Sequence, residues 1–161
     1  MKQALPMHRL QRFGMLCLTT ILLAAGLPPP DAQSTPVISK GFYAEDNFAS
    51  CTIAYCEIVF TAVPAAKTVI ITNVTCLIRT IGAPNIPVAQ LYNSQNQQLD
   101  VLVPVFLGNY ASGGQTLREY AVNHVVTQIV LTGRTPRVAA QTFNSVGTLS
   151  FMQCSISGLI R

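Results

Sequence analysis

The segment from residue 68 to 80, which reads TVIITNVTCLIRT, constrains the fold of this chain more than any other. β-Branched side chains are stiff at χ1 and pack well on a pleated sheet, so a run this rich in them favours a strand over a helix. The first half of the run is apolar on both faces. We therefore expect a central strand that the rest of the protein covers.

Two further segments alternate with the period of two that a half-buried strand requires. Residues 56–63 place Cys56, Ile58, Phe60 and Ala62 on one face and Glu57, Val59, Thr61 and Val63 on the other. Residues 115–122 place Leu117, Glu119 and Ala121 on one face and Arg118, Tyr120 and Val122 on the other, with one face exposed to solvent. Five more segments resemble strands: 88–92, 99–106, 125–131, 137–143 and 149–160.

Turn residues separate these segments, and no ten-residue helical periodicity occurs after residue 32. Gly108–Gly114 reads as a loop, Asn123-His124 separates two strands, and Pro104 indicates an edge position or a bulge. With 50% hydrophobic residues the chain has ample surface to bury, which excludes a disordered polyelectrolyte. The fold class we expect is all-β: an antiparallel β-sandwich of about eight strands over residues 51–161, jelly-roll or immunoglobulin-like, with a small barrel as the alternative.

Residues 1–32 have the pattern of a signal peptide. Lys2, Arg9 and Arg12 precede the uncharged stretch Met15–Leu27, which is shorter than the roughly 20 residues that a membrane-spanning helix needs. Cleavage is expected between residues 26 and 33, and an uncleaved anchor is the alternative. We expect secretion to the periplasm or the medium, no transmembrane domain after cleavage, and an irregular N-terminal arm over residues 33–50.

Four cysteines remain after residue 32, and an even number in an exported chain predicts disulfides. Three pairings are possible. We favour Cys76 with Cys154, because both lie inside long apolar runs, and Cys51 with Cys56, which closes a small loop. A metal site at the second pair would need reduced thiolates in an oxidising compartment, so we expect no metal and no cofactor.

The sequence offers no obvious catalytic group. His124 is the one histidine after residue 32, no Gly-x-Ser-x-Gly motif occurs, and Glu57 and Glu119 form a carboxylate pair only if their strands share a face. Calcium at Glu45-Asp46 would need more oxygen ligands than the arm supplies. An enzyme, a small secreted hydrolase, is therefore the least favoured class.

Charge gives little information about a partner. From residue 33 onward seven basic and five acidic side chains leave a net charge of +2, so the basic character of the whole chain comes largely from the signal, and we expect no nucleic acid. A ligand face for an anionic or sugar polymer is possible where arginine forks and aromatic rings gather. The residues we assign to it are Arg118, Tyr120, Arg134, Arg137 and Tyr110.

The function we expect is that of an exported, non-catalytic module that binds a glycan or a cell-surface protein. The alternative is an assembly subunit that lends or accepts a strand at a sheet edge. The long apolar strands and the arm at 33–50 would suit that second role.

Overall fold

Strand β4 (Val69–Gly82) lies inside the larger of two antiparallel sheets, as its β-branched run predicts. This sheet, here sheet A, has the order β1-β2-β10-β4-β8-β7. Its other strands are β1 (Val37–Ser39), β2 (Phe42–Ser50), β10 (Gly147–Ile160), β8 (Gln115–Val130) and β7 (Val105–Ser112). One face of β4 is more deeply buried than the other, because its side chains alternate between buried and half-buried.

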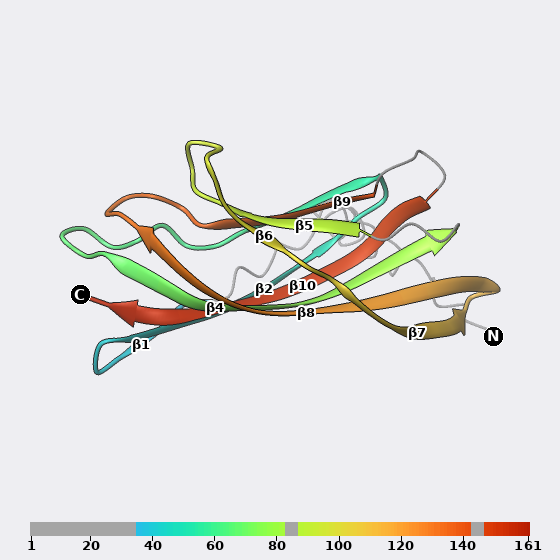
Figure 1. Ribbon diagram of the computed structural model, residues 1–161, viewed down its shortest axis with the longest axis horizontal. Helices are drawn as coiled ribbons and strands as arrows, with labels where there is room; N and C mark the ends of the chain where they lie inside the picture. The colour runs from blue at the N-terminus through green and yellow to red at the C-terminus, as the bar shows by residue number, and fades with distance from the viewer. Residues whose placement is uncertain (1–34, 83–86, 143–146) are drawn as a thin grey trace, which may run out of the picture. The chain divides into compact units, whose positions relative to one another are not determined.

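The smaller sheet, sheet B, has the order β3-β9-β5-β6. It consists of β3 (Tyr55–Val59), β9 (Arg137–Thr142), β5 (Pro87–Tyr92) and β6 (Gln98–Leu102). The computed structural model describes residues 35–82, 87–142 and 147–161, and these contain ten strands and no helix. The segment predicted as a signal peptide lies outside the described residues. The expected all-β fold in two antiparallel sheets is confirmed (Figure 1).

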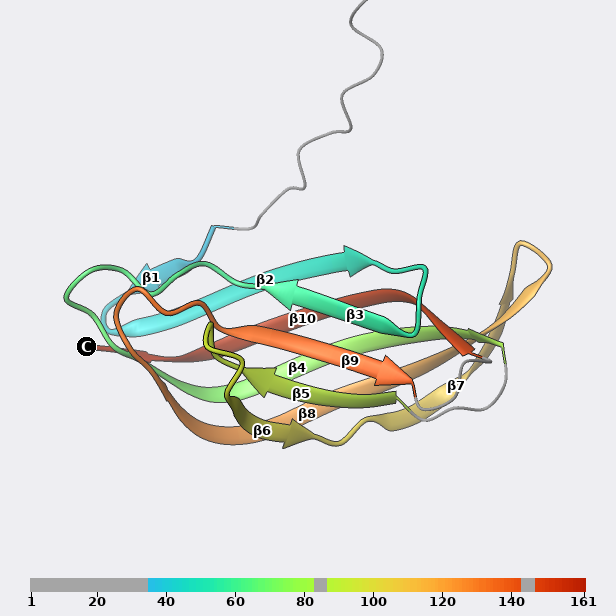
Figure 2. The same ribbon diagram turned by 90° about the horizontal axis from the view of Figure 1, so that it is seen from above.

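The core lies between the two sheets, which face each other as layers (Figure 2). Sheet A contributes Ile71, Ile78 and Met152, and sheet B contributes Ile58 and Leu91, each of them 2% exposed or less. The predicted alternation of residues 56–63 is correct along β3, where Cys56 and Ile58 are buried. The same holds for residues 115–122, where Tyr120 and Val122 face the core.

The irregular arm expected at residues 33–50 is the main error of the sequence-based prediction. Residues 42–50 form β2, which pairs with β10 along nine positions and buries Tyr43 and Glu45. Charged and small residues in this segment weaken the hydrophobic alternation. The backbone nevertheless pairs, because β10 has a free edge beside it.

Three strand boundaries also differ from the prediction. Residues 115–130 form one strand, so Asn123 and His124 lie inside β8 rather than between strands. Strand β7 continues through Gly108 to Ser112, and only Gly113 and Gly114, with φ of 57° and 77°, form the turn. Residues 99–106 divide near Pro104, where the chain passes from β6 in sheet B to β7 in sheet A. Both are edge strands, as the proline indicates.

Bulges decide which side chains leave the core. The β10–β4 register shifts between Leu149 and Phe151, so Leu149 is buried while Phe151 lies on the other face of the sheet. A second shift follows Ser157, next to Gly158. A Cβ atom at Gly158 would lie 1.9 Å from the carbonyl oxygen of Ile70, so only glycine fits there. No helix among the described residues is long and apolar enough to cross a membrane.

Candidate functional site

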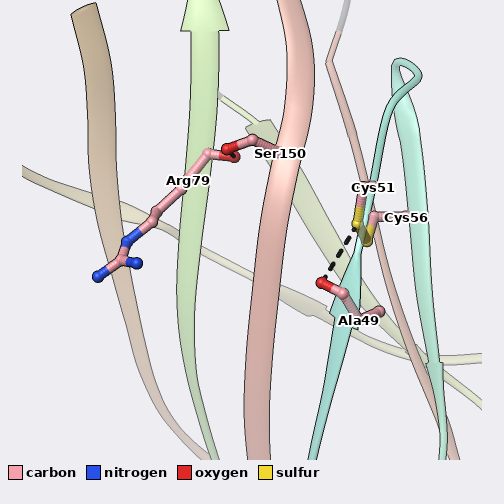
Figure 3. Close-up of a disulfide and its surroundings, with 5 residues drawn as sticks. All are labelled: Ala49, Cys51, Cys56, Arg79 and Ser150. Atoms are coloured by element: carbon pink, nitrogen blue, oxygen red, sulfur yellow. Dashed lines mark hydrogen bonds between the residues drawn. A yellow bond between two sulfur atoms is a disulfide. The ribbon is translucent and has the colours of Figure 1, made fainter. Parts of the chain in front are cut away.

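Both predicted disulfides are present. Cys76 and Cys154 are direct partners in β4 and β10, with Cα atoms 4.1 Å apart, and both are buried. Cys51 and Cys56 close the short connection from sheet A to sheet B, and the disulfide sulfur of Cys51 lies 3.6 Å from the carbonyl oxygen of Ala49 (Figure 3). The first bond links neighbouring strands of sheet A, whereas the second joins the two sheets.

The five residues assigned to a ligand face do not form one surface. Tyr120 is buried and packs on Phe106, with ring centroids 5.4 Å apart. Arg118 shares this core-directed face of β8, since its strand partner Thr80 is buried. Tyr110 pairs with Leu117 and so lies on the opposite face of sheet A.

Arg134 and Arg137 lie instead at the sheet B side of the molecule. Arg137 in β9 donates to Glu57 at 2.9 Å and also hydrogen-bonds to Asn96. Its strand partner is Tyr92, whose hydroxyl donates to the side chain of Gln90. This face is polar, and its hydrogen-bonding groups bind one another.

The carboxylate pair considered for glycoside hydrolysis is divided between the two sheets. Glu57 is paired with Arg137 on the outer face of sheet B. Glu119 lies 3.6 Å from Arg79 Nε, on the outer face of sheet A. The core separates the two carboxylates, so they do not flank one substrate bond.

His124 lies close to Asp100. Its Nε2 atom is 3.9 Å from Asp100 Oδ1, which joins β8 to β6 across the two sheets. Among the described residues, no group of three or more His, Cys, Asp and Glu side chains is placed to hold a metal ion.

Glu45 and Asp46 point to opposite faces of β2, so they do not form one calcium site. Glu45 is 4% exposed and accepts hydrogen bonds from the hydroxyl of Tyr43 at 2.5 Å and from the backbone N–H and hydroxyl of Thr61 at 2.9 and 2.8 Å. Asp46 accepts from Ser155 on the outer face. Glu45 therefore ties sheet A to the segment that follows β3.

The outer face of sheet A carries a cluster of aromatic rings around one arginine. The guanidinium carbon of Arg79 lies 5.4 Å from the ring centre of Tyr110 and 5.3 Å from that of Phe151, within cation–π range of both. Phe48 stacks on Phe151, with centroids 6.4 Å apart. Glu119, directly opposite Arg79 in the register, completes an ion pair.

Backbone contacts hold this cluster in place. Ser150, the bulged residue of β10, donates its hydroxyl to the carbonyl oxygen of Arg79 at 3.2 Å, and its own carbonyl oxygen accepts from the N–H of Cys51 at 3.1 Å. Figure 3 shows the Arg79 side chain extending away from Ser150 and the Cys51–Cys56 bond, on the other side of β4. The short disulfide loop thus contacts the bulge that turns Phe151 outward.

A second group of apolar side chains lies on the same face near the other end of sheet A, and the outward residues Gln153, Ser155 and Ser157 of β10 separate it from the cluster. Phe42, Leu159, Ile70 and Ile129 are directly opposed in β2, β10, β4 and β8, so they form a row across four strands. Three of them are 44% to 59% exposed, and Ile70 is half-buried. Val125, on β8, is 81% exposed. Contiguous apolar surface of this kind commonly marks a protein-interaction site.

Sequence reasoning identified only Tyr110 of this cluster. Arg79, Phe48 and Phe151 lie in strands far apart in the chain, and the bulge at Ser150 places Phe151 on the outer face. The available signal was the low charge: 10% of residues are charged, against about 25% in typical domains.

No protein-family model matches this chain, and a search of curated proteins finds no similar sequence.

Proposed function

We propose that the mature chain is an exported, non-catalytic binding module, and that it binds a protein partner through the outer face of sheet A. The observation that carries the proposal is the position of Arg79 between Tyr110 and Phe151, beside the exposed ring of Phe48 and on the same face as a row of exposed apolar side chains. Tyrosine and arginine in an apolar setting are typical of the few residues that dominate binding energy at protein interfaces.

The chemistry of this face favours a protein over a glycan. Arg79 and Glu119 neutralise each other, and Asp46 is bonded to Ser155, so three charged side chains on this face leave one uncompensated charge. Phe42, Phe48 and Val125 offer apolar area and no hydrogen bonds. Burying such surface is favourable at about 25 cal/mol per Å².

Export is supported by the two disulfides and by the signal-like residues 1–32. The first test is the intact mass of the protein recovered outside the cytoplasm, with and without alkylation. We expect a chain that begins between residues 27 and 34 and has no free thiol. A retained Met1 or reactive thiols would contradict export.

The second test locates the binding face. A photo-crosslinking phenylalanine analogue is placed at Phe48 on sheet A or, as the matched control, at Tyr55 on the outer face of sheet B, and irradiated in the producing culture. We expect an adduct of defined mass from position 48, none from position 55, and loss of the adduct in Arg79→Ala. Adducts at twice the subunit mass are scored separately as self-association.

A glycan array tests the alternative that the ligand is a glycan. Retention of a glycan that is lost in Arg137→Ala and unchanged in Arg79→Ala would place binding on sheet B and refute the proposal. Equal crosslinking from both faces would refute it as well.

A further inference from the structure

Among the described edge strands, β7 is the one with the least protection against pairing with another chain. Edge strands present unpaired N–H and C=O groups, and proteins shield them by shortness, charge or cover. β1 has three residues and is followed by Lys40, β3 contains Glu57, and β6 contains Asp100. β7, Val105–Ser112, is the longest of the four edge strands, with eight residues and no charged side chain, and a register shift between Phe106 and Gly108 interrupts its pairing with β8.

Two of the other edges, β3 and β6, are also held by side-chain contacts from the facing sheet. The side-chain amide of Asn47 donates to the carbonyl oxygen of Val59 at 2.9 Å, which places β2 against β3. His124 and Asp100 join β8 to β6. β7 pairs with β8 on one side, and Val105, Phe106 and Leu107 are 50% to 62% exposed. In the view of Figure 2 the β7–β8 hairpin ends away from the strands of sheet B.

We infer that β7 pairs in antiparallel orientation with β7 of a second copy of this chain, so that two sheets A join edge to edge. In an antiparallel two-fold contact, residue i of one copy meets residue j of the other and j meets i, so the central residues of the strand lie near their own counterparts. An uncharged strand tolerates this, whereas the same contact at β3 or β6 would bring two glutamates or two aspartates together. The small net charge of +2 after residue 32 opposes association only weakly.

The occupant cannot be the segment at residues 33–50 of the same chain, although that arm was considered as a donor strand. Residues 37–39 and 42–50 already form β1 and β2 at the opposite side of sheet A. The β7 contact is independent of the partner face, because it joins backbone edges, whereas Arg79 and Phe151 lie on β4 and β10, further inside sheet A.

The test is the mass of the mature, disulfide-bonded protein measured by sedimentation over a range of concentrations. We expect a monomer–dimer equilibrium. Leu107→Lys places the residue that natural edges use at an exposed position of β7, and should raise the dissociation constant at least tenfold. The matched control is Val37→Lys on β1, the other edge of the same sheet, because Val37 and Leu107 are 63% and 58% exposed. Circular dichroism and the Tm check that both variants fold.

Single cysteines at 107, 109 or 111 supply a second measurement. We expect disulfide-linked dimers on oxidation from at least one of these positions and none from Val37→Cys. A monomer at every concentration overturns the inference, and so does a dimer that resists Leu107→Lys or that Val37→Lys abolishes. If the crosslinker at position 48 gives no adduct with another protein while the dimer forms, the partner face is refuted and the β7 contact is not.

Discussion

The guanidinium carbon of Arg79 lies 5.3 Å from the ring centre of Phe151, its direct partner in the neighbouring strand. Arg79→Ala and Phe151→Leu should each lower the free energy of unfolding modestly. Because the contact is partly exposed, their coupling energy should be about 0.5–1 kcal/mol. A double-mutant cycle in urea measures it. Additive effects would show that the two side chains are neighbours without an energetic interaction.

Gly158→Ala should destabilise the fold strongly, because the added Cβ would meet the carbonyl oxygen of Ile70 at 1.9 Å and the backbone would have to move. We expect a loss of about 2 kcal/mol or more in the free energy of unfolding. Gly108→Ala is the control: it lies in β7, a Cβ there meets nothing within 4 Å, and its φ is not positive. Equal losses in both variants would contradict the close approach of β10 to β4.

Alkaline pH should weaken the fold through Tyr43. Burial, and then the hydrogen bond to Glu45, raises the pKa of Tyr43 well above its ordinary 10.0. The folded state keeps the phenol protonated, while the unfolded chain ionises above about pH 10, so its contribution is complete below that pH and is lost as the pH rises. The free energy of unfolding should fall by about 1.4 kcal/mol for each pH unit above 10.

Urea unfolding at pH 8 and 11 measures this slope. Tyr43→Phe should be less stable at pH 8, because Glu45 loses a donor, and should have a shallower alkaline slope. Tyr55→Phe is the control: burial raises the pKa of Tyr55 as well, but its side chain is exposed, so its removal should change the slope little. An unchanged slope in Tyr43→Phe would rule out this assignment.

The two disulfides should reduce in order. Cys51 is half-buried, whereas Cys76 and Cys154 are both buried, so thiolate attack under native conditions should open Cys51–Cys56 first. Timed alkylation and peptide mapping follow each bond. The Cys76→Ala/Cys154→Ala pair should cost about 4 kcal/mol, more than removal of the short link, because it releases the longer loop of the unfolded chain. Earlier loss of the Cys76–Cys154 bond would contradict this order.

The local sequence pattern correctly predicted most of the strands but not all of their first and last residues. The alternation in residues 56–63 and the β-branched run at 68–80 correctly indicate strands, since side-chain direction alternates along any strand. Residues 42–50 were misassigned because their pairing depends on the free edge of β10, which is distant in sequence. Asn123-His124 likewise looks like a break, yet β4 pairs with β8 on both sides of it.

By itself, the sequence determined the all-β class and the lack of a recognisable catalytic motif, and among three possible disulfide pairings it favoured the Cys76–Cys154 and Cys51–Cys56 bonds that the structure contains. The tertiary structure alone decided which side chains share a surface. It buried Tyr120, separated Arg137 from Tyr110, and gathered Phe48, Arg79 and Phe151 on sheet A. The physical reason is that strand order and bulges, which depend on long-range backbone pairing, set the face of each residue, and a shift of one residue reverses it.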